Sequence, residues 1–148
     1  MKGPQHISSA NQRYLGYQEV CKESGIEEQY IECGYSYESG LKKAEELITK
    51  YPDVDGIIAS NDMVAISVYK SLIQKGYHIP EDIQIIGFDN IRFGWLFTPE
   101  ITTIAQPTKK IGKKAAQLII NYRNGHKIEK INIFDIELIE RQTTKQRG

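Results

Sequence analysis

Two short apolar runs in this chain end abruptly in side chains that can hydrogen-bond to a ligand. Residues 57–59 lead into Ser-Asn-Asp, and residues 83–87 lead into Phe-Asp-Asn, which contains Asp89. Runs of this kind are typical of buried parallel strands, and ligands gather where such strands end in open α/β sheets. Because a carboxylate accepts hydrogen bonds from hydroxyl groups, we expect Asp89 to contact a polar ligand at this sheet edge.

Arg13 and Tyr35 are two further candidates for the same edge. Arg13 lies one turn into an expected helix, close to the helix mouth, and the position is equally compatible with a surface arginine. Tyr35 alternates with Tyr37 at the expected end of a strand, where an exposed aromatic ring can stack on a ligand. Half-buried core positions are the alternative for both tyrosines.

Motifs of the common enzymes and metal sites are absent from the sequence. The Gly-x-Ser-x sequence beginning at Gly34 resembles a nucleophile elbow, but Glu38 stands where the second glycine belongs. No glycine-rich phosphate loop, His-Glu-x-x-His or Cys-x-x-Cys occurs. The three histidines are scattered through expected loops: His6, His78 and His126. The sequence therefore predicts a binding domain rather than an enzyme, with no cofactor and no metal.

The composition is that of an ordinary globular protein. Hydrophobic residues make up 40% of the 148 residues and charged residues 26%. The 19 basic and 19 acidic residues balance, so the chain has no electrostatic reason to bind nucleic acid by itself. The basic run at residues 109–114 is better explained as a solvated helix face.

Several features bear on the compartment and the extent of the chain. Cys21 and Cys33 lack metal-ligand spacing and are expected to be isolated thiols. No secretory signal is recognisable, and no apolar run approaches the roughly 20 residues that a membrane span needs. We therefore expect a cytoplasmic protein. Because residues 1–4 enter structure almost at once, we also expect that an upstream part is missing.

Periodicity and capping residues predict alternating helices and strands. A helix should open with Ser8 or Ser9 as its N-cap and end at Gly25. The remaining expected elements are a polar strand at 28–33, an amphipathic helix after Gly40 that Tyr51-Pro52 ends, a strand at 57–59, a helix at 62–75, strands at 83–87 and 101–104, a helix at 109–123 and a half-exposed strand at 131–138.

Two segments carry more apolar surface than one core requires. The helix at 62–75 is apolar around much of its circumference, which favours burial on two sides or a subunit interface. The loop at 91–99 holds Phe93, Trp95, Leu96 and Phe97, which suggests contact with a partner. Packing of this loop onto the chain's own core is the alternative.

Several sequence segments together resemble the effector-binding part of the lactose-repressor/galactose-repressor (LacI/GalR) family. They are residues 55–62 (DGIIASND), 79–83 (IPEDI), 86–90 (IGFDN), 98–99 (TP), 101–104 (ITTI), 106–107 (QP) and 139–144 (IERQTT). Gly3-Pro4, Ser9, Arg13 and Gly16-Tyr17 match as well. The resemblance implies an α/β fold with a Rossmann-like three-layer parallel sheet, the C-terminal lobe of a type I periplasmic-binding-protein-like domain.

The resemblance also implies how the chain is divided. Residues 1–105 would form the C-terminal lobe, 106–126 a helix belonging to a missing N-terminal lobe, and 127–148 a return strand and tail. The family's helix-turn-helix DNA-binding domain is absent from this chain. The helix at 109–123 would lack its sheet, so we expect its apolar face to dock on a neighbouring chain or to repack. That face comprises Ile111, Ala115, Leu118 and Ile119.

The resemblance assigns effector contacts residue by residue. They fall on Ser9, Arg13, Tyr35, Asn61, Asp89 and Gln106. Tyr35 stands where the lactose branch has tryptophan, which favours the ribose-type or purine-type branches. Phe88 stands where many members have tyrosine, so one hydroxyl is lost. The expected effector is a sugar such as ribose, or a purine-like molecule.

Family dimers pair through the surfaces that the apolar pattern also indicates. The expected interface residues here are Met63, Ile66, Lys70, Trp95, Leu96 and Phe97. By resemblance, the chain is the effector-binding and dimerisation portion of a transcriptional repressor that acts by lobe closure. Operator DNA would be bound only through the missing N-terminal domain, and no membrane partner is expected. A transport-type sugar-binding protein is the alternative, and an α/β enzyme fragment is disfavoured because it lacks a catalytic set.

Overall fold

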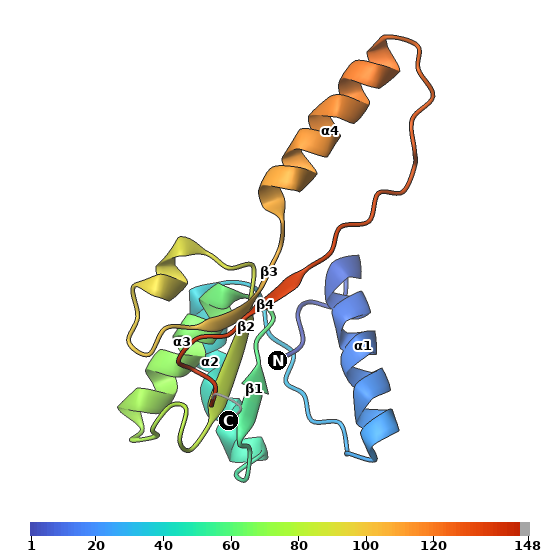
Figure 1. Cartoon of the computed structure of the whole chain (residues 1–148). Helices are drawn as coiled ribbons and strands as arrows, with labels where there is room; N and C mark the ends of the chain where they lie inside the picture. Colours follow the sequence, from blue (N-terminus) through green and yellow to red (C-terminus); the bar gives the residue numbers. More distant parts are fainter. Residues whose placement is uncertain (146–148) are drawn as a thin grey trace.

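The computed structural model describes residues 1–145 and contains one four-stranded sheet with the order β1-β2-β3-β4. The strands are β1 (Gly56–Ile58), β2 (Gln84–Phe88), β3 (Thr102–Ala105) and β4 (Glu137–Ile139). The first three run parallel, and β4 runs antiparallel to β3 (Figure 1). The carboxyl ends of three parallel strands therefore meet at one sheet edge. The last three residues of the expected tail lie outside the described residues.

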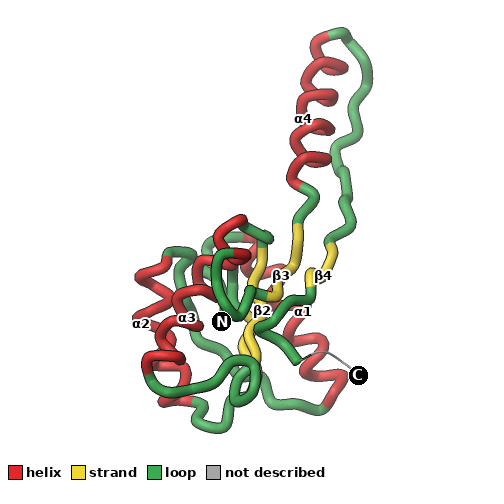
Figure 2. The backbone as a smooth tube through the Cα atoms, turned by 60° about the vertical axis from the view of Figure 1, so that its left-hand side comes forward, coloured by secondary structure: helices red, strands yellow, loops and turns green. Residues whose placement is uncertain are grey.

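Helices cover both faces of this sheet. α2 (Tyr37–Lys50) and α3 (Asp62–Gln74) lie together on one face, and α1 (Ser8–Ser24) lies on the other (Figures 1 and 2). A short 3₁₀ helix, η1 (Arg92–Trp95), follows β2. The predicted three-layer α/β architecture is confirmed.

The main core lies where α3 packs against both α2 and the sheet. Val64, Val68 and Leu72 are fully buried and recur every four residues, so they form one stripe along α3. They belong to one cluster with Ile85 and Ile101 of the sheet region. Burying each such side chain contributes about 1.5–3 kcal/mol. This packing holds the N-terminus of α3 at the edge of the sheet where the parallel strands end.

The helix starts differ from the prediction at two places. The residue before α1 is Ile7, and no side chain caps the helix, so neither Ser8 nor Ser9 is the N-cap. Ser36 caps α2 by accepting a hydrogen bond from the Ser39 N–H, and this makes Tyr37 the first helical residue. Tyr37 therefore does not alternate with Tyr35 on a strand. Gly25 ends α1 with φ 65°, as predicted.

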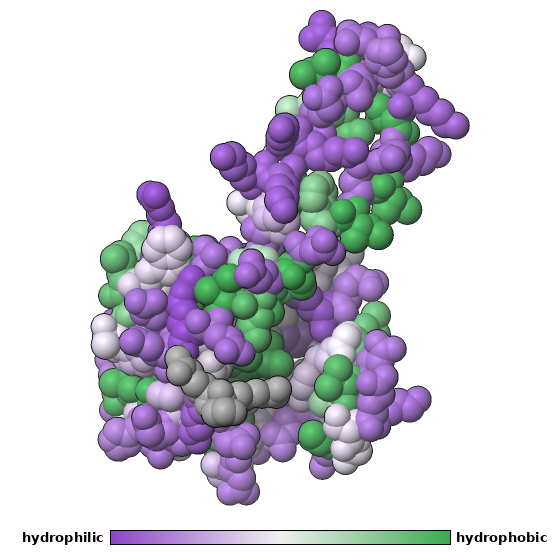
Figure 3. All heavy atoms as spheres, viewed as in Figure 1, coloured by the Kyte–Doolittle hydropathy of each residue, from purple (hydrophilic) through white to green (hydrophobic). Residues whose placement is uncertain are grey.

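α4 (Thr108–Arg123) and the returning segment project away from the sheet as an arm (Figure 1). No residue of α4 is buried, so the apolar face around Ile119 does not repack on the rest of the chain. Figure 3 shows apolar side chains among hydrophilic ones on this arm. Docking of this face on a neighbouring chain stays a prediction.

Two expected strands are much shorter than their sequence patterns. The return strand forms only at residues 137–139, because β3 ends at Ala105 and offers no partner beyond it. Residues 28–33 form a single parallel bridge, between Glu32 and Lys2. A strand needs a neighbour for its backbone groups, and pattern alone does not supply one.

Two further points concern the cysteines and membranes. Cys21 and Cys33 are buried free thiols, as expected. Across residues 1–145, every helix is too short or too polar to cross a membrane.

Candidate functional site

The candidate site lies where β1, β2 and β3 end and α1 and α3 begin. Arg13 is its central cation. Its Nη1 donates to the Ser60 carbonyl at 2.8 Å, and its Nη2 donates to the Tyr35 hydroxyl at 2.9 Å. The guanidinium carbon also lies 4.4 Å from the centroid of the Phe88 ring. Hydrogen bonds therefore hold the Arg13 side chain in place at this edge, and its contact with an effector stays a prediction.

Ser9 contributes through its backbone. Its carbonyl oxygen accepts a hydrogen bond from Arg13 Nε at 3.2 Å. A guanidinium has five N–H donors, of which these contacts with Ser9, Ser60 and Tyr35 use three. Among residues 1–145, two N–H donors of Arg13 thus have no partner and can serve a ligand.

The Asn61 side chain forms hydrogen bonds with two backbone segments, the start of α3 and the loop at Tyr35. Its Oδ1 accepts from the Val64 N–H at 2.9 Å and so caps α3, while its Nδ2 donates to the Tyr35 carbonyl at 3.1 Å. Within the described part of the chain, the second N–H of this amide has no partner and can serve a ligand. The signal for this capping role was present in the sequence, because asparagine directly before a helix is a favoured N-cap.

Asp89, which follows β2, and Gln106, which follows β3, form a hydrogen-bonded polar pair at this edge. Gln106 Nε2 donates to Asp89 Oδ1 at 2.7 Å, and the Asp89 N–H donates to the Ile104 carbonyl at 2.9 Å. Asp89 and Asn90 have φ of 112° and 55°, a left-handed conformation that ordinary residues adopt rarely. Within residues 1–145, Asp89 Oδ2 has no hydrogen-bond partner, so it can accept from ligand hydroxyl groups.

Asp62 is a buried carboxylate that was not among the residues predicted for the site. Only 1% of its surface is exposed, and it accepts hydrogen bonds from the Thr103 hydroxyl (2.6 Å) and the Ile91 N–H (2.7 Å). Burial raises the pKa of this carboxyl, and the two hydrogen bonds partly oppose the rise. A Cβ at Gly87 would lie 2.1 Å from Asp62 Oδ1, so only glycine fits beside it. An acidic residue directly after the capping asparagine was the available signal.

Asn90 connects this edge to the apolar loop. Its Oδ1 accepts from Arg141 Nη2 at 2.6 Å and from Trp95 Nε1 at 3.3 Å. Its backbone N–H donates to the Thr103 hydroxyl, which in turn donates to Asp62. A continuous chain of hydrogen bonds thus runs from the start of α3 to Trp95.

The expected dimer residues divide into exposed and buried groups. Ile66 is only 3% exposed because it faces the core between α3 and the sheet, so it has no surface to offer a partner. Phe97 is half-buried and packs edge-on against Tyr69, while Met63 is half-buried. Leu96, at 77% exposure, is open to contact, and Trp95 and Lys70 are also exposed.

The site has the donors, acceptors and flat apolar rings that a polyol requires. Its cation is Arg13 and its acceptor is Asp89, while Phe88 and Tyr35 supply rings. Within the part of the chain that the structure describes, no group of three or more His, Cys, Asp and Glu side chains could hold a metal ion. This arrangement suits binding of a neutral hydroxylated molecule.

Comparisons with known proteins agree along the whole chain. The family described as periplasmic binding protein-like domain matches residues 2–144. The chain is 36% identical over 148 residues to the ribose operon repressor of Bacillus subtilis (strain 168), covering 99% of this chain and 45% of that protein.

Two solved structures are similar throughout. One is a transcriptional regulator CelR-cellobiose complex, with 26% identity, a TM-score of 0.90, and coverage of 97% of this chain and 45% of that one. The other is the transcription regulator CcpA of Lactococcus lactis, with 29% identity, a TM-score of 0.89, and coverage of 97% of this chain and 54% of that one. The chain thus spans about half the length of the relatives it matches.

Proposed function

Since this chain belongs to the family of periplasmic binding protein-like domains and its relatives are LacI-family regulators, we propose that it is the effector-binding portion of a transcriptional repressor. Its effector is a small hydroxylated molecule, a sugar such as ribose. The similarity to a ribose operon repressor supports the choice of a pentose. The chain binds and senses; it does not catalyse a reaction.

The observation that carries this proposal is the pairing of Asp89 with Gln106. Gln106 holds one carboxylate oxygen of Asp89 and leaves Oδ2 for the ligand. Neighbouring hydroxyl groups of a sugar can both donate to such an oxygen. Arg13 adds two N–H donors, and Phe88 and Tyr35 offer flat faces for the C–H side of a sugar ring.

The proposed effector contacts are made by six residues. They are Ser9, Arg13, Tyr35, Asn61, Asp89 and Gln106. In Ser9 the hydroxyl is the group that reaches the ligand, because its carbonyl already holds Arg13. In Asn61 the remaining amide N–H does so.

The proposed mechanism is closure of two lobes over the effector. Gln106 lies directly between β3 and α4, where the chain leaves the sheet. A ligand that binds both Asp89 and Gln106 favours the closed arrangement by its differential affinity for it. The hydrogen bonds from Asp62 through Thr103 and Asn90 then connect the effector edge to Trp95.

Two further parts of the proposal concern partners. Two copies pair through the exposed side chains of Trp95, Leu96 and Lys70, with Met63 and Phe97 at the margin. Operator DNA is bound by a separate helix-turn-helix domain, because the net charge of this chain is zero. The protein acts in the cytoplasm, where its operator lies.

Asp89→Ala tests the proposal. In a polypeptide that joins this chain to its N-terminal lobe, titration calorimetry with ribose, other pentoses, hexoses and purines should find one preferred ligand. Loss of the Asp89 carboxylate should lower the affinity for that ligand by at least about 100-fold, since hydrogen bonds to charged groups contribute about 1.5–3 kcal/mol each. Asp53→Ala, on the exposed surface, is the control. An unchanged affinity of Asp89→Ala for that ligand would refute the assignment of Asp89 to the effector site.

A further inference from the structure

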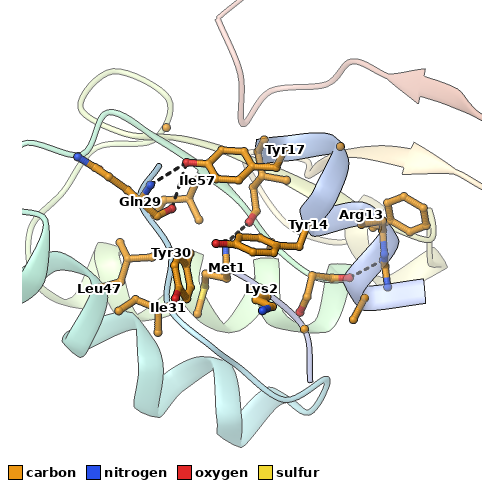
Figure 4. A pocket seen from close by; sticks show the side chains of 18 of the residues that line it. Met1, Lys2, Arg13, Tyr14, Tyr17, Gln29, Tyr30, Ile31, Leu47 and Ile57 are labelled. Atoms are coloured by element: carbon orange, nitrogen blue, oxygen red, sulfur yellow. Dashed lines mark hydrogen bonds between the residues drawn. The ribbon is translucent and has the colours of Figure 1, made fainter. Parts of the chain in front are cut away.

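Different contacts hold the two charged side chains of the proposed effector site. Arg13 lies at one end of a cavity of about 450 Å³ (Figure 4), where hydrogen bonds to Ser60 and Tyr35 fix its guanidinium. Asp89 belongs to the turn after β2, and within residues 1–145 its carboxylate is held by Gln106 alone. The backbone of this turn therefore decides where the Asp89 carboxylate points.

The turn after β2 has an unusual backbone. Asp89 and Asn90 have φ of 112° and 55°, and both carry side chains, which disfavour this left-handed region. Two such residues in succession persist only where the surrounding contacts determine their conformation. If the turn relaxed to negative φ, the Asp89 side chain would leave its place beside Gln106.

Two successive backbone N–H groups of this turn depend on Asp62. The Ile91 N–H donates directly to Asp62 Oδ2 at 2.7 Å. The Asn90 N–H donates to the Thr103 hydroxyl at 3.3 Å, and that hydroxyl donates to Asp62 Oδ1 at 2.6 Å. Hydrogen bonds to a carboxylate are stronger than those between neutral groups. Both oxygens of Asp62 thus hold the turn, one directly and the other through Thr103.

Asp62 is too deeply buried to contact an effector itself. It is the first residue of α3, and only 1% of its surface is exposed. Its Oδ1 would lie 2.1 Å from a Cβ at Gly87, so the carboxylate fits against β2 only because that position is glycine. Any effect of Asp62 on effector binding must therefore pass through the groups that it holds.

Arg141 and Trp95 also hold Asn90, but they do so at its side chain. Arg141 Nη2 and Trp95 Nε1 donate to Asn90 Oδ1 at 2.6 Å and 3.3 Å. Rotation about the side-chain bonds of Asn90 can preserve these contacts while its φ changes. The backbone N–H groups have no such freedom, so the contacts with Asp62 and Thr103 are the ones that set φ.

We propose that Asp62 is a positioning residue for the effector: its carboxylate fixes the left-handed turn at residues 89–90 and so aims the Asp89 carboxylate at the ligand. This inference rests on the proposed effector site. Asp62 acts through its hydrogen bonds rather than its charge, because a second negative charge nearby does not favour the ionised form of Asp89. Its loss lowers affinity for the effector as well as stability.

The first test needs no ligand and uses the chain as it stands. A positive φ brings the amide and α protons of one residue close together, so Asp89 and Asn90 should each show a strong nuclear Overhauser effect (NOE) between these protons. Both NOEs should weaken in Asp62→Ala. Val68→Ala is the control, because it removes two buried methyl groups from the same helix and no bond to the turn. Strong NOEs retained in Asp62→Ala would overturn the proposal.

The second test measures affinity for ribose by titration calorimetry in the polypeptide that includes the N-terminal lobe. Asp62→Ala should bind at least ~30-fold more weakly, while Val68→Ala should stay within ~3-fold of the unmodified protein. In Asp62→Asn the amide oxygen can accept from the Ile91 N–H and the amide nitrogen can donate to Thr103, so the affinity should stay within ~5-fold.

Two results of this titration would refute the positioning role. Equal losses in Asp62→Ala and Val68→Ala would mean that Asp62 supports stability alone. An Asp62→Asn as weak as Asp62→Ala would mean that the hydrogen bonds do not carry the effect. Normal ribose binding by Asp89→Ala would instead refute the proposed effector site, and the NOEs of the turn would be unaffected by that failure.

Thr103→Val supplies a variant that keeps the acidic residue. It retains a buried side chain of similar shape and removes the hydroxyl that links Asn90 to Asp62. The Asn90 NOE should weaken, and ribose affinity should fall by ~3–10-fold. Combined with Asp62→Ala, the loss should be smaller than the product of the two separate losses, because both changes break one chain of bonds. Losses that multiply would contradict the proposal.

Discussion

Replacing the buried carboxylate Asp62 should destabilise the fold more than any surface change nearby. In Asp62→Ala the Thr103 hydroxyl and the Ile91 N–H both lose their acceptor. Each unsatisfied buried group costs about 1–3 kcal/mol, and relief from burying a carboxylate offsets part of the sum. We therefore expect a loss of about 3 kcal/mol from a total stability of roughly 5–15 kcal/mol.

Urea unfolding followed by circular dichroism measures this loss. With a slope of about 2 kcal/mol per molar urea, the midpoint should fall by about 1.5 M. Asp53→Ala, at an exposed position, should stay within about 0.5 kcal/mol of the unmodified chain. A loss below about 1 kcal/mol in Asp62→Ala would show that the hydrogen bonds from Thr103 and Ile91 contribute little to the stability of the fold.

The pH dependence of Asp62 follows from the sign of its pKa shift. Burial raises the pKa of the folded carboxyl above its usual value of 3.8, so the folded state binds the proton more tightly than the unfolded state. The resulting stability is present at low pH and is lost as pH rises from about 3.8 through the raised pKa. Asp62→Asn lacks this titration. The stability of the unmodified chain relative to Asp62→Asn should therefore decline across that window, and a rise would contradict the assignment.

Three other substitutions test particular contacts. Asn61→Ala should cost about 1 kcal/mol in urea unfolding, because the Val64 N–H loses its cap, and no loss would argue against the capping geometry. Gly87→Ala should cost about 1–3 kcal/mol by displacing Asp62, and the combination with Asp62→Ala should cost less than the sum of the two. Leu96→Glu should leave monomer stability within about 0.5 kcal/mol but shift sedimentation toward monomer, and an unchanged association state would exclude Leu96 from the interface.

Much of the site could be predicted because of a general property of parallel sheets. Strands that run parallel end at one edge, so Asn61 and Asp89 had to approach each other once the two apolar runs were recognised as neighbouring strands. Arg13 and Tyr35 were open alternatives until the fold placed them in a hydrogen bond with each other. Local pattern carries no information on such a contact, because the two residues come from separate elements.

Other features depended on which neighbours the fold provides. The helix at 62–75 and the loop at 91–99 both showed excess apolar surface, but packing decided that Ile66 of the helix faces inward and Leu96 of the loop faces outward. The sequence patterns at 28–33 and 131–138 predicted longer strands than the structure contains. Strands form only where another backbone lies beside them, so only Glu32 and residues 137–139 are paired.

The sequence by itself determined the order of most helices and strands and the edge at which polar side chains gather. These depend on periodicity, capping and residue type, which are local. Only the tertiary structure decided that Asp62 is buried against Gly87, that Asn90 joins the site to Trp95, and that a cavity separates segment 29–33 from β1. Those are contacts between distant parts of the chain, and they exist only once packing brings the elements together.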